Sequence, residues 1–459
     1  MCVTASAADL KVSGYWMHSF TFADNLFSSR APDRNAAGGD GTFSAEQRVR
    51  MTLSMVAGES LSGSVELQVG NGLGPNSMYR WGESGVGGSG KVVTARQAYL
   101  DWVLPSTDIQ VRMGRSLVVL PSYTFGSTVL ALSTDGVMVS APVNDSVTLT
   151  LGWLRPYSSI AAWGREYQDG SSVDLGFLSA DVSGENFKIT PWGMFGVVGN
   201  NVGDWKTSIA GENVWIKNHN KSDMLGFEAA DRSTMAYWAG LSGEISLFDP
   251  FRFTADFFYS ANDANGRAGR SGWYAAAGVE MNTARAIPFL RGWYSTGDDA
   301  DSEKSGRILT VGRYWGHHDA SSIYFDADNY ITGTPDVPSA DGTWGVQLGV
   351  KEVSFLNNLT HKLSVSYFQG TNNTNRITAG LYEPEYGGVK NTPIGYLTTR
   401  DSAWSIDSVN TLALGDGFSI NLILAYLVTN FDEEVWRHAG NDPDYGNIFR
   451  GTLNFTYFF

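Results

Sequence analysis

The stretch that restricts the fold most is residues 447–459. Read with a period of two, it places Phe449, Leu453, Phe455, Tyr457 and Phe459 on one face and polar side chains on the other. This alternation predicts a β-strand with one apolar face. Such a strand, with aromatic residues at its end, is typical of the closing strand of a membrane barrel, where the apolar face meets lipid. We expect Phe455, Tyr457 and Phe459 to provide this barrel closure signal.

Segments of the same kind recur along the chain, and the connections between them alternate between short and long. A short turn is Gly58-Glu59-Ser60, and the long connections include 199–233, 297–342 and 370–400. The pattern predicts one all-β domain over residues 9–459, a transmembrane antiparallel β-barrel of about 18 strands, with 16 as the alternative. The short turns would be periplasmic and the long loops extracellular. A propeller or a solenoid would show an internal sequence repeat, which the chain lacks.

Composition agrees with a sheet-rich chain and narrows the function. Charged residues make up 17% and aromatic residues 13% of the chain, against a usual charged share of about 25%. The net charge of −15 argues against a nucleic-acid partner. The single Cys2 excludes a disulfide framework and a Cys-based zinc site. No window approaches the ~18–20 apolar residues of a transmembrane helix, so this chain would span a membrane only as a barrel.

Residues 1–8 resemble the end of an export signal, because Ala5-Ser6-Ala7 fits the small-x-small pattern that precedes signal cleavage. The alternative is a start without such a meaning. Export as a barrel would place the protein in the outer membrane of a bacterial cell. Its partners there would be the barrel assembly machinery during biogenesis and, afterwards, outer-membrane lipid and lipopolysaccharide.

Periodicity alone does not decide which face of the sheet points outward, but two features favour the apolar face. Aromatic residues near the strand ends, such as Trp16, Trp102 and Trp273, resemble the girdles of a membrane barrel. The polar faces carry charge at mid-strand, as at Arg50 and Arg252. With 16 to 18 strands, side chains do not fill the interior and an aqueous channel remains. Transport by diffusion therefore follows from the strand count.

The polar faces supply the candidate pore-lining side chains. The basic candidates are Arg48, Arg50, Arg112, Lys188, Arg252, Arg291, Lys351 and Arg450, and the acidic candidates are Glu66, Asp101 and Asp256. Clustered guanidinium groups in a narrow aqueous pore favour anions, so Arg48, Arg50 and Arg112 indicate an anion preference. In the alternative interpretation, these arginines pair with Glu66 and Asp101 and only shape the wall.

One long connection, residues 116–135, is unlike the others because it has a single charge, Asp135, and many apolar residues. A connection that faces water would not need them. We predict that this loop folds into the barrel and narrows the pore, with Leu120, Tyr123, Phe125 and Asp135 as its constriction residues. The alternatives are a loop that contacts a neighbouring subunit and an unrecognised pair of strands.

The chain offers little for catalysis or metal binding. It has six His residues and no nucleophile-elbow motif, so we expect no enzyme and no cofactor. Asp298, Asp299 and Asp301 are the candidates for a structural Ca²⁺ site, because clustered carboxylate oxygens are the ligands that this ion takes. A solvated acidic loop is the alternative.

Four motifs together resemble the outer-membrane homotrimeric porin family of sulfate-reducing bacteria. They are Ala8-Asp9-Leu10-Lys11-Val12-Ser13-Gly14-Tyr15, Val111-Arg112-Met113-Gly114-Arg115, Thr134-Asp135-Gly136-Val137 and Phe455-Thr456-Tyr457-Phe458-Phe459. The resemblance spans the chain and implies a homotrimer, an inward third loop between the fifth and sixth strands, and passive flux of small hydrophilic solutes. The mostly uncharged third loop and the start at Cys2 depart from the family.

The expected function is therefore that of an outer-membrane porin, a water-filled channel for passive diffusion of small hydrophilic solutes and ions, with a preference for anions. The alternative is a substrate-specific outer-membrane channel with a saturable binding site. Saturable and competable flux would distinguish the second from the first.

Overall fold

The computed structural model describes residues 9–24, 42–70, 79–81, 92–158, 172–200, 205–209, 212–216, 232–266, 269–311, 317, 319–325, 340–379, 396–438 and 446–459. The export-signal remnant predicted at residues 1–8 lies outside these residues. So do parts of the long loops predicted at 199–233, 297–342 and 370–400.

The described chain is almost entirely β-structure. Its main sheet has nineteen strands. One of them, the short β4 (Tyr79–Arg80), pairs with β2 at Glu46 and Gln47 and is not counted among the strands of the wall. The remaining eighteen form the wall: β1 (Asp9–Asp24), β2 (Thr42–Val56), β3 (Leu61–Gly70), β5 (Val92–Val103), β6 (Gln110–Val119), β7 (Ala131–Asn144), β8 (Val147–Ser158), β9 (Ser172–Gly184), β10 (Phe187–Val198), β13 (Thr234–Phe248), β14 (Phe251–Asn262), β15 (Ser271–Met281), β16 (Ile287–Ser295), β17 (Thr343–Leu356), β18 (Leu359–Gly370), β19 (Ser402–Leu414), β20 (Phe418–Asn430) and β21 (Asn447–Phe458).

Each wall strand pairs antiparallel with the next, and the pairing of β1 with β21 closes the sheet. That last pairing runs from Tyr15 opposite Phe458 to Asp24 opposite Phe449. The terminal residue takes part as well, because Gly14 N–H donates to the Phe459 carbonyl at 2.9 Å and Phe459 N–H donates back at 3.1 Å. The prediction of an 18-strand closed antiparallel barrel is confirmed, and residues 447–459 do form its closing strand.

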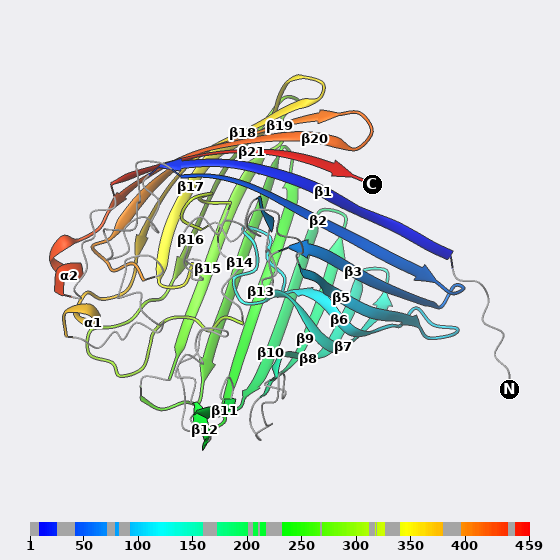
Figure 1. Cartoon of the computed structure of the whole chain (residues 1–459), viewed down its shortest axis with the longest axis horizontal. Helices are drawn as coiled ribbons and strands as arrows, with labels where there is room; N and C mark the ends of the chain where they lie inside the picture. The colour runs from blue at the N-terminus through cyan, green and yellow to red at the C-terminus, as the bar shows by residue number, and fades with distance from the viewer. Residues whose placement is uncertain are drawn as a thin grey trace.

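The start of β1 and the end of β21 lie at one end of the barrel, together with short turns (Figure 1). The short helices α1 (Asn375–Thr378) and α2 (Glu433–His438) lie in long connections at the opposite end (Figure 1). The strands β11 (Trp205–Ile209) and β12 (Glu212–Ile216) form a separate two-stranded sheet. Within the described residues, no helix is long and apolar enough to cross a membrane.

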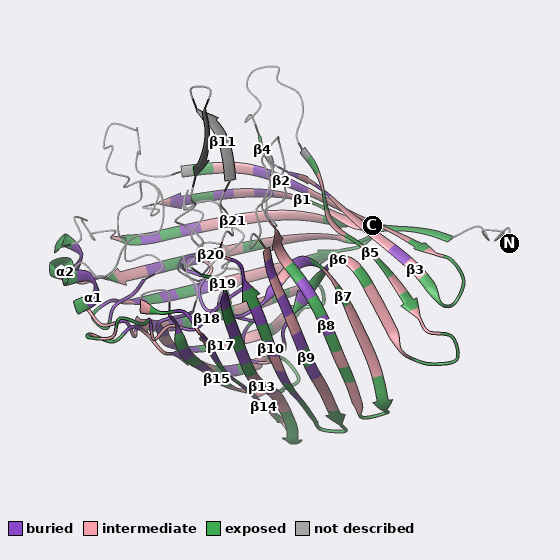
Figure 2. Cartoon of the chain, turned by 90° about the horizontal axis from the view of Figure 1, so that it is seen from below, coloured by how far each residue is buried: buried purple, intermediate pink, exposed green. Residues whose placement is uncertain are grey.

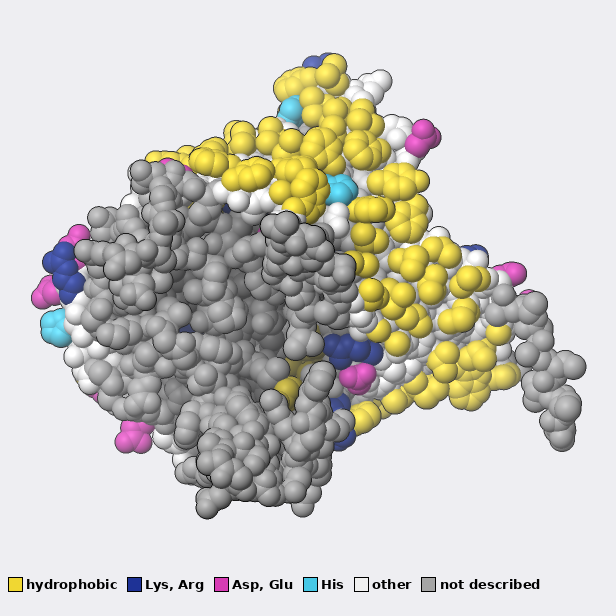
Figure 3. All heavy atoms as spheres, in the orientation of Figure 1, with side chains coloured by type: hydrophobic (Ala, Val, Ile, Leu, Met, Phe, Trp, Pro, Cys, Tyr) yellow, Lys and Arg dark blue, Asp and Glu magenta, His cyan; other side chains and the backbone are white. Residues whose placement is uncertain are grey.

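The two faces of each wall strand differ in the way that the sequence alternation predicts. On β14, Phe253 and Phe257 are 42% and 50% exposed, whereas Thr254, Asp256 and Ser260 between and beyond them are buried. The same alternation of exposed and buried positions is visible along many strands (Figure 2). Hydrophobic side chains cover much of the outer surface over β1, β2 and the strands that follow (Figure 3). The apolar face of the sheet therefore points outward.

Outward aromatic residues form a belt near the end that carries the long connections. Strand register places Tyr259 opposite Trp273, Tyr294 opposite Trp344, Tyr367 opposite Trp404 and Tyr426 opposite Phe449. The belt continues on the other side through Tyr237, Phe195 and Trp153. Belts of this kind mark the membrane–water interface of a barrel.

Closure at Gly14 depends on the lack of a side chain. A Cβ at Gly14 would lie 2.1 Å from the Arg50 carbonyl oxygen and 3.0 Å from the Phe459 ring, whereas a Cβ at Gly193 would come no closer than 3.8 Å to a neighbour.

We expect Gly14→Ala to destabilise the barrel by about 1–3 kcal/mol, the usual cost of overpacking. Gly193→Ala, the matched control, should leave stability unchanged. The measurement is the temperature at which the barrel loses its compact migration in SDS gels, and equal temperatures for both variants would contradict the closure assigned to Gly14.

Candidate functional site

The connection between β6 and β7 is held against the inward faces of distant strands. Asp256 of β14 accepts the Tyr123 and Thr124 N–H groups at 2.8 Å each, and the Ser122 hydroxyl at 3.2 Å. The Ser242 hydroxyl of β13 donates to the Pro121 carbonyl at 2.9 Å. Because Asp256 and Ser242 are buried on the face opposite the exposed Phe257 and Leu241, the connection lies inside the barrel. The predicted inward fold of this loop is confirmed.

The inward part is shorter than predicted. β6 continues to Val119 and β7 begins at Ala131, so the first inward connection comprises residues 120–130 rather than 116–135. Of its predicted constriction residues, Leu120 and Phe125 are buried and Tyr123 is partly buried, with its hydroxyl 3.2 Å from the Thr190 hydroxyl of β10. The prediction for Asp135 was wrong. Asp135 lies on β7, pairs with Arg115 on the outward face and is largely exposed.

A second connection, part of the long loop predicted at residues 297–342, also enters the barrel, and its inward course was not predicted. Its described inner part, the second inward connection, comprises residues 308–311, 317 and 319–325. Leu309 receives a hydrogen bond from Trp238 and donates one to Ser260, on β13 and β14. Ser322 bonds to Asp407 of β19 through its N–H and its hydroxyl, and its carbonyl accepts from Arg450 of β21.

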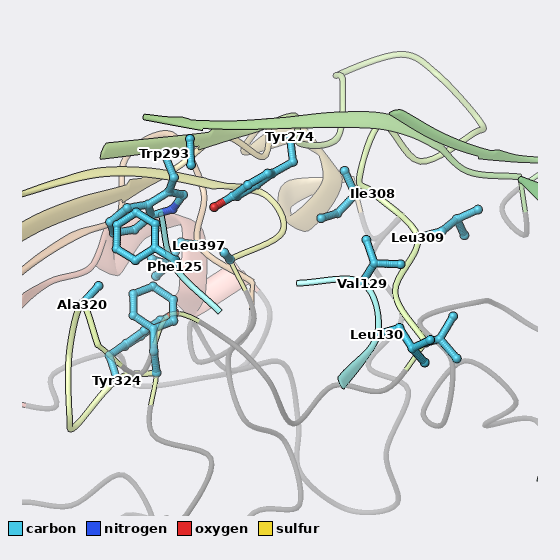
Figure 4. Close-up of a cluster of buried hydrophobic side chains, with 14 of the residues drawn as sticks. Phe125, Val129, Leu130, Tyr274, Trp293, Ile308, Leu309, Ala320, Tyr324 and Leu397 are labelled. Carbon is cyan, nitrogen blue, oxygen red and sulfur yellow. The ribbon is translucent and has the colours of Figure 1, made fainter. Parts of the chain in front are cut away.

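The two inward connections meet in one buried apolar cluster. The Phe125 ring stacks on His317 with centroids 4.3 Å apart and contacts Trp293 edge-on at 5.3 Å. The Val311 N–H donates to the Val129 carbonyl at 2.7 Å. Figure 4 shows Phe125 beside Trp293 and Val129 on the side of Ile308 and Leu309. Each connection therefore supplies part of the surface that buries the other.

Arg291 of β16 joins both connections to the wall. Its guanidinium donates to the Thr124 carbonyl at 2.9 Å and to the Asp319 carboxylate at 2.9 Å, and lies 4.8 Å from the Phe125 ring centroid. Lys362 of β18 donates to the other Asp319 oxygen at 2.9 Å. Burial opposes the charge of Asp319, but Lys362 and Arg291 outweigh it and hold the pKa of this carboxyl well below its ordinary value.

A second group of charges lies on the inward side of β2, β3, β5 and β6. Arg112 makes a two-pronged contact with Asp101 at 2.7 and 2.8 Å, and Arg96 donates to Glu66 at 2.8 Å. Arg50 donates to Gln68 at 2.7 Å, and Arg48, two residues earlier on β2, is buried. Pairing with Glu66 and Asp101, the alternative raised from the sequence for Arg48, Arg50 and Arg112, is therefore present for Arg112 with Asp101. Glu66 pairs instead with Arg96.

The remaining predicted pore-lining residues also lie on inward positions and make polar contacts. Arg252 lies between Glu244 and Glu280, and Lys351 donates to Glu280 at 2.7 Å. Lys188 lies 5.5 Å from the Tyr123 ring centroid. Arg450 is buried under the second inward connection, as Asp256 is buried under the first.

Two features of the site were missed from the sequence. A register shift between β3 and β5 places Glu66 opposite Gln97 and Leu67 opposite Ala95, so that Arg96 and Gln97 both bond to Glu66. Such a bulge puts two consecutive residues on one face, which a strict period of two does not anticipate. Asp319 was missed because the whole loop 297–342 was interpreted as an outer loop from the acids at its start, although residues 308–325 have a single acid and several apolar residues, such as Ile308, Leu309 and Phe325.

The candidate calcium ligands do not form an open site. The two carboxylate oxygens of buried Asp298 accept hydrogen bonds from Ser305, at 2.6 Å, and Tyr396, at 2.7 Å. Asp299 and Asp301 are exposed. In the part of the chain that the structure describes, no three His, Cys, Asp or Glu residues are grouped so that they could hold a metal ion.

Comparisons with known proteins identify the fold. No family model matches the chain, and no curated protein matches it. The structure is similar to crystal structures of three Pseudomonas aeruginosa proteins. OccK11 (OpdR) is 12% identical, with a TM-score of 0.53 over 98% of this chain and 96% of that one. OpdL is 11% identical, with a TM-score of 0.52 over 98% and 99%. OpdK, solved with vanillate, is 9% identical, with a TM-score of 0.54 over 98% of both chains.

We expect Asp256→Ala to release the first inward connection, because the Tyr123 and Thr124 N–H groups lose their acceptor at once, whereas the Ser122 hydroxyl keeps the Phe125 carbonyl. Each unsatisfied buried group costs about 1–3 kcal/mol. The connection should then move away from the wall, and the single-channel conductance in a planar bilayer should become larger or noisier. Asp256→Asn keeps one acceptor oxygen and should have an intermediate effect. Conductance traces that match the unchanged protein for both variants would contradict this role of Asp256.

Proposed function

We propose that the protein is an outer-membrane channel whose water-filled lumen lets small hydrophilic solutes and ions diffuse passively, with a preference for anions. The closed wall of eighteen strands, apolar on the outside and polar on the inside, supports this function. In a barrel of that size the side chains of the wall do not fill the interior. The outer aromatic belt supports a position across a membrane.

The observation that carries the proposal is the combination of inward connections with inward cations. The two connections occupy part of the lumen and narrow what remains, so that a passing solute must approach charged side chains closely. Around Asp319, two cations face one carboxylate. On β2, β3, β5 and β6, Arg48, Arg50, Arg96 and Arg112 stand against Glu46, Glu66 and Asp101. An excess of guanidinium and ammonium groups at a constriction favours anions.

Planar-bilayer recording tests this function directly. Purified protein should insert in discrete conductance steps, and in a KCl gradient the reversal potential should have the sign of chloride selectivity. Absence of conductance steps from folded protein would contradict the channel, and the sign of potassium selectivity would contradict the anion preference alone.

One observation favours a substrate-specific channel as a second candidate. OpdK was solved with vanillate, an aromatic carboxylate. In this chain, Arg291 lies 4.8 Å from the ring centroids of both Phe125 and Phe289, with Lys362 on the same wall. Because both rings are buried, the cations Arg291 and Lys362 would be the groups that meet the carboxylate of such a solute. Uptake of an aromatic carboxylate into liposomes should saturate and be competable if a binding site controls flux, and should rise linearly with concentration if diffusion alone does.

We expect Asp319→Asn to increase anion selectivity, because Arg291 and Lys362 lose the carboxylate that offsets their charge. A unit charge acts on an ion a few ångströms away in water with about 0.5–1 kcal/mol, which corresponds to about a two- to fivefold rise in the chloride-to-potassium permeability ratio. Asp299→Asn removes an equal charge from an exposed position of the same loop and serves as the control. Equal reversal potentials for the two variants would rule out this role of Asp319.

The depressed pKa of Asp319 predicts how this effect depends on pH. A carboxyl whose folded pKa is lowered contributes its stabilisation above its unfolded pKa, about 3.9, and loses it only as pH falls through the lower folded value. Asp319 should therefore stay ionised at pH 4. The difference in reversal potential between the unchanged protein and Asp319→Asn should persist from pH 7 to pH 4, and its disappearance by pH 4 would show that Asp319 titrates normally.

A further inference from the structure

A row of four charged residues crosses the outward face of β6, β7, β8 and β9. Arg115 shares the outward face of β6 with Met113 and Leu117, which are 41% and 40% exposed. Strand register then places Asp135 opposite Arg115, and Arg155 opposite Asp135. Asp174 completes the row through its ion pair with Arg155. We call these four residues the charged row.

The side chains of the charged row are exposed on the outer surface of the barrel. The side chains of Arg115, Asp135 and Arg155 are 40%, 62% and 43% exposed. Arg115 meets Asp135 through one nitrogen at 3.1 Å, and Arg155 meets Asp174 through two, at 2.8 and 3.1 Å. In Figure 3, basic and acidic side chains gather where the hydrophobic surface over these strands ends.

On β8 and β9, strand register relates the charged row to the aromatic belt. Trp153 lies opposite Gly176, which lies opposite Phe195, which lies opposite Tyr237. Arg155 and Asp174 are each two residues further toward the long connections, which is about 7 Å along a strand. At that step beyond the belt, β15, β18 and β19 carry the uncharged polar residues Ser271, Gln369 and Ser402, whereas β10 and β13 carry the apolar Val197 and Met235.

This level is that of the lipid headgroups if the belt marks the edge of the apolar layer. Outward charges in the middle of a bilayer are costly, and the cost falls toward the interface. Trp153 belongs to both features, because it is part of the belt while its ring N–H donates to Asp174 at 3.0 Å and its ring lies 5.2 Å from the Arg155 guanidinium. Arg155 and Asp174 therefore lie at the outer edge of the belt, where headgroup phosphates would be, and Arg115 and Asp135 continue the row on the neighbouring strands.

We propose that the charged row binds the phosphate groups of lipopolysaccharide in the outer leaflet. Arg115 and Arg155 flank Asp135 at a separation of two strands, about 10 Å, and a guanidinium binds a phosphate through two parallel N–H groups. This inference rests on the proposed outer-membrane location but not on the channel. A contact with a second copy of the chain is disfavoured because the core of a protein interface is depleted of charged residues.

The test measures lipopolysaccharide bound per barrel, by native mass spectrometry of detergent-solubilised protein titrated with purified lipopolysaccharide. The double variant Arg115→Gln, Arg155→Gln should bind about tenfold more weakly, the factor for losing about 1.4 kcal/mol. Arg437→Gln is the matched control, because Arg437 is also exposed and paired, with Glu433 at 2.6 Å, but lies on α2. It should bind as the unchanged protein does.

Two further variants separate phosphate binding from a purely structural role. Arg115→Lys with Arg155→Lys keeps the charge and should retain most of the binding. Asp135→Asn removes the carboxylate between the two arginines and should bind lipopolysaccharide more tightly, since phosphate is no longer repelled. Compact migration in SDS gels establishes that each variant has folded.

Several outcomes would overturn the proposal. One is unchanged lipopolysaccharide binding by the folded glutamine variant. A second is a change in oligomeric mass without a change in lipid binding, which would make the row a contact between copies. A third is equal, arginine-dependent binding of phosphatidylglycerol, which would make any anionic phospholipid the ligand. Bilayer conductance is measured on the same samples, and its absence from the unchanged protein would refute the channel while leaving the lipid result to stand by itself.

Discussion

The pairing of β1 with β21 is the interaction on which the rest of the structure depends. An open sheet of this length would expose two rows of unpaired backbone groups, and neither lipid nor the sheet itself could satisfy them. Ten residues of β1, from Tyr15 to Asp24, have partners in β21, and Gly14 and Phe459 extend the pairing to the end of the chain. Once the sheet is closed, its apolar face has nowhere to pack against itself and must meet an apolar medium.

Closure also creates the interior that the two inward connections occupy. Neither connection could bury its apolar residues alone, and together they share the cluster around Phe125 and His317. Ionic contacts fix this cluster to the wall, chiefly Arg291 with Asp319. If the proposed channel conducts anions, the groups that act on a passing anion are partly the groups that hold the inward connections in place, so that selectivity and the shape of the pore are linked.

Period-two alternation was sufficient to predict the wall, because each strand buries one face and exposes the other, as β14 does from Phe251 to Tyr259. It failed where backbone geometry breaks the period, as at Arg96, and where a strand continues further than its composition suggests, as at Asp135. The second inward connection carried the same kind of signal as the first, an apolar stretch that includes Ile308 and Leu309, but the acids at the start of its loop led to its interpretation as an outer loop. Asp319 resembles any loop acid until Arg291 and Lys362 are placed beside it.

The most direct test of this account compares two adjacent residues of β18, one on each face. Lys362 points inward to Asp319, and Leu363 is 51% exposed on the outside. Each is replaced by cysteine, as Lys362→Cys or Leu363→Cys, in protein with Cys2→Ser, and the proteins are reconstituted in liposomes and treated with a charged, membrane-impermeant thiol reagent. The account predicts modification of the cysteine at 362 and protection of the cysteine at 363 by lipid. Modification at 363 with protection at 362 would show that the apolar face is wet and the interior dry, and would contradict it.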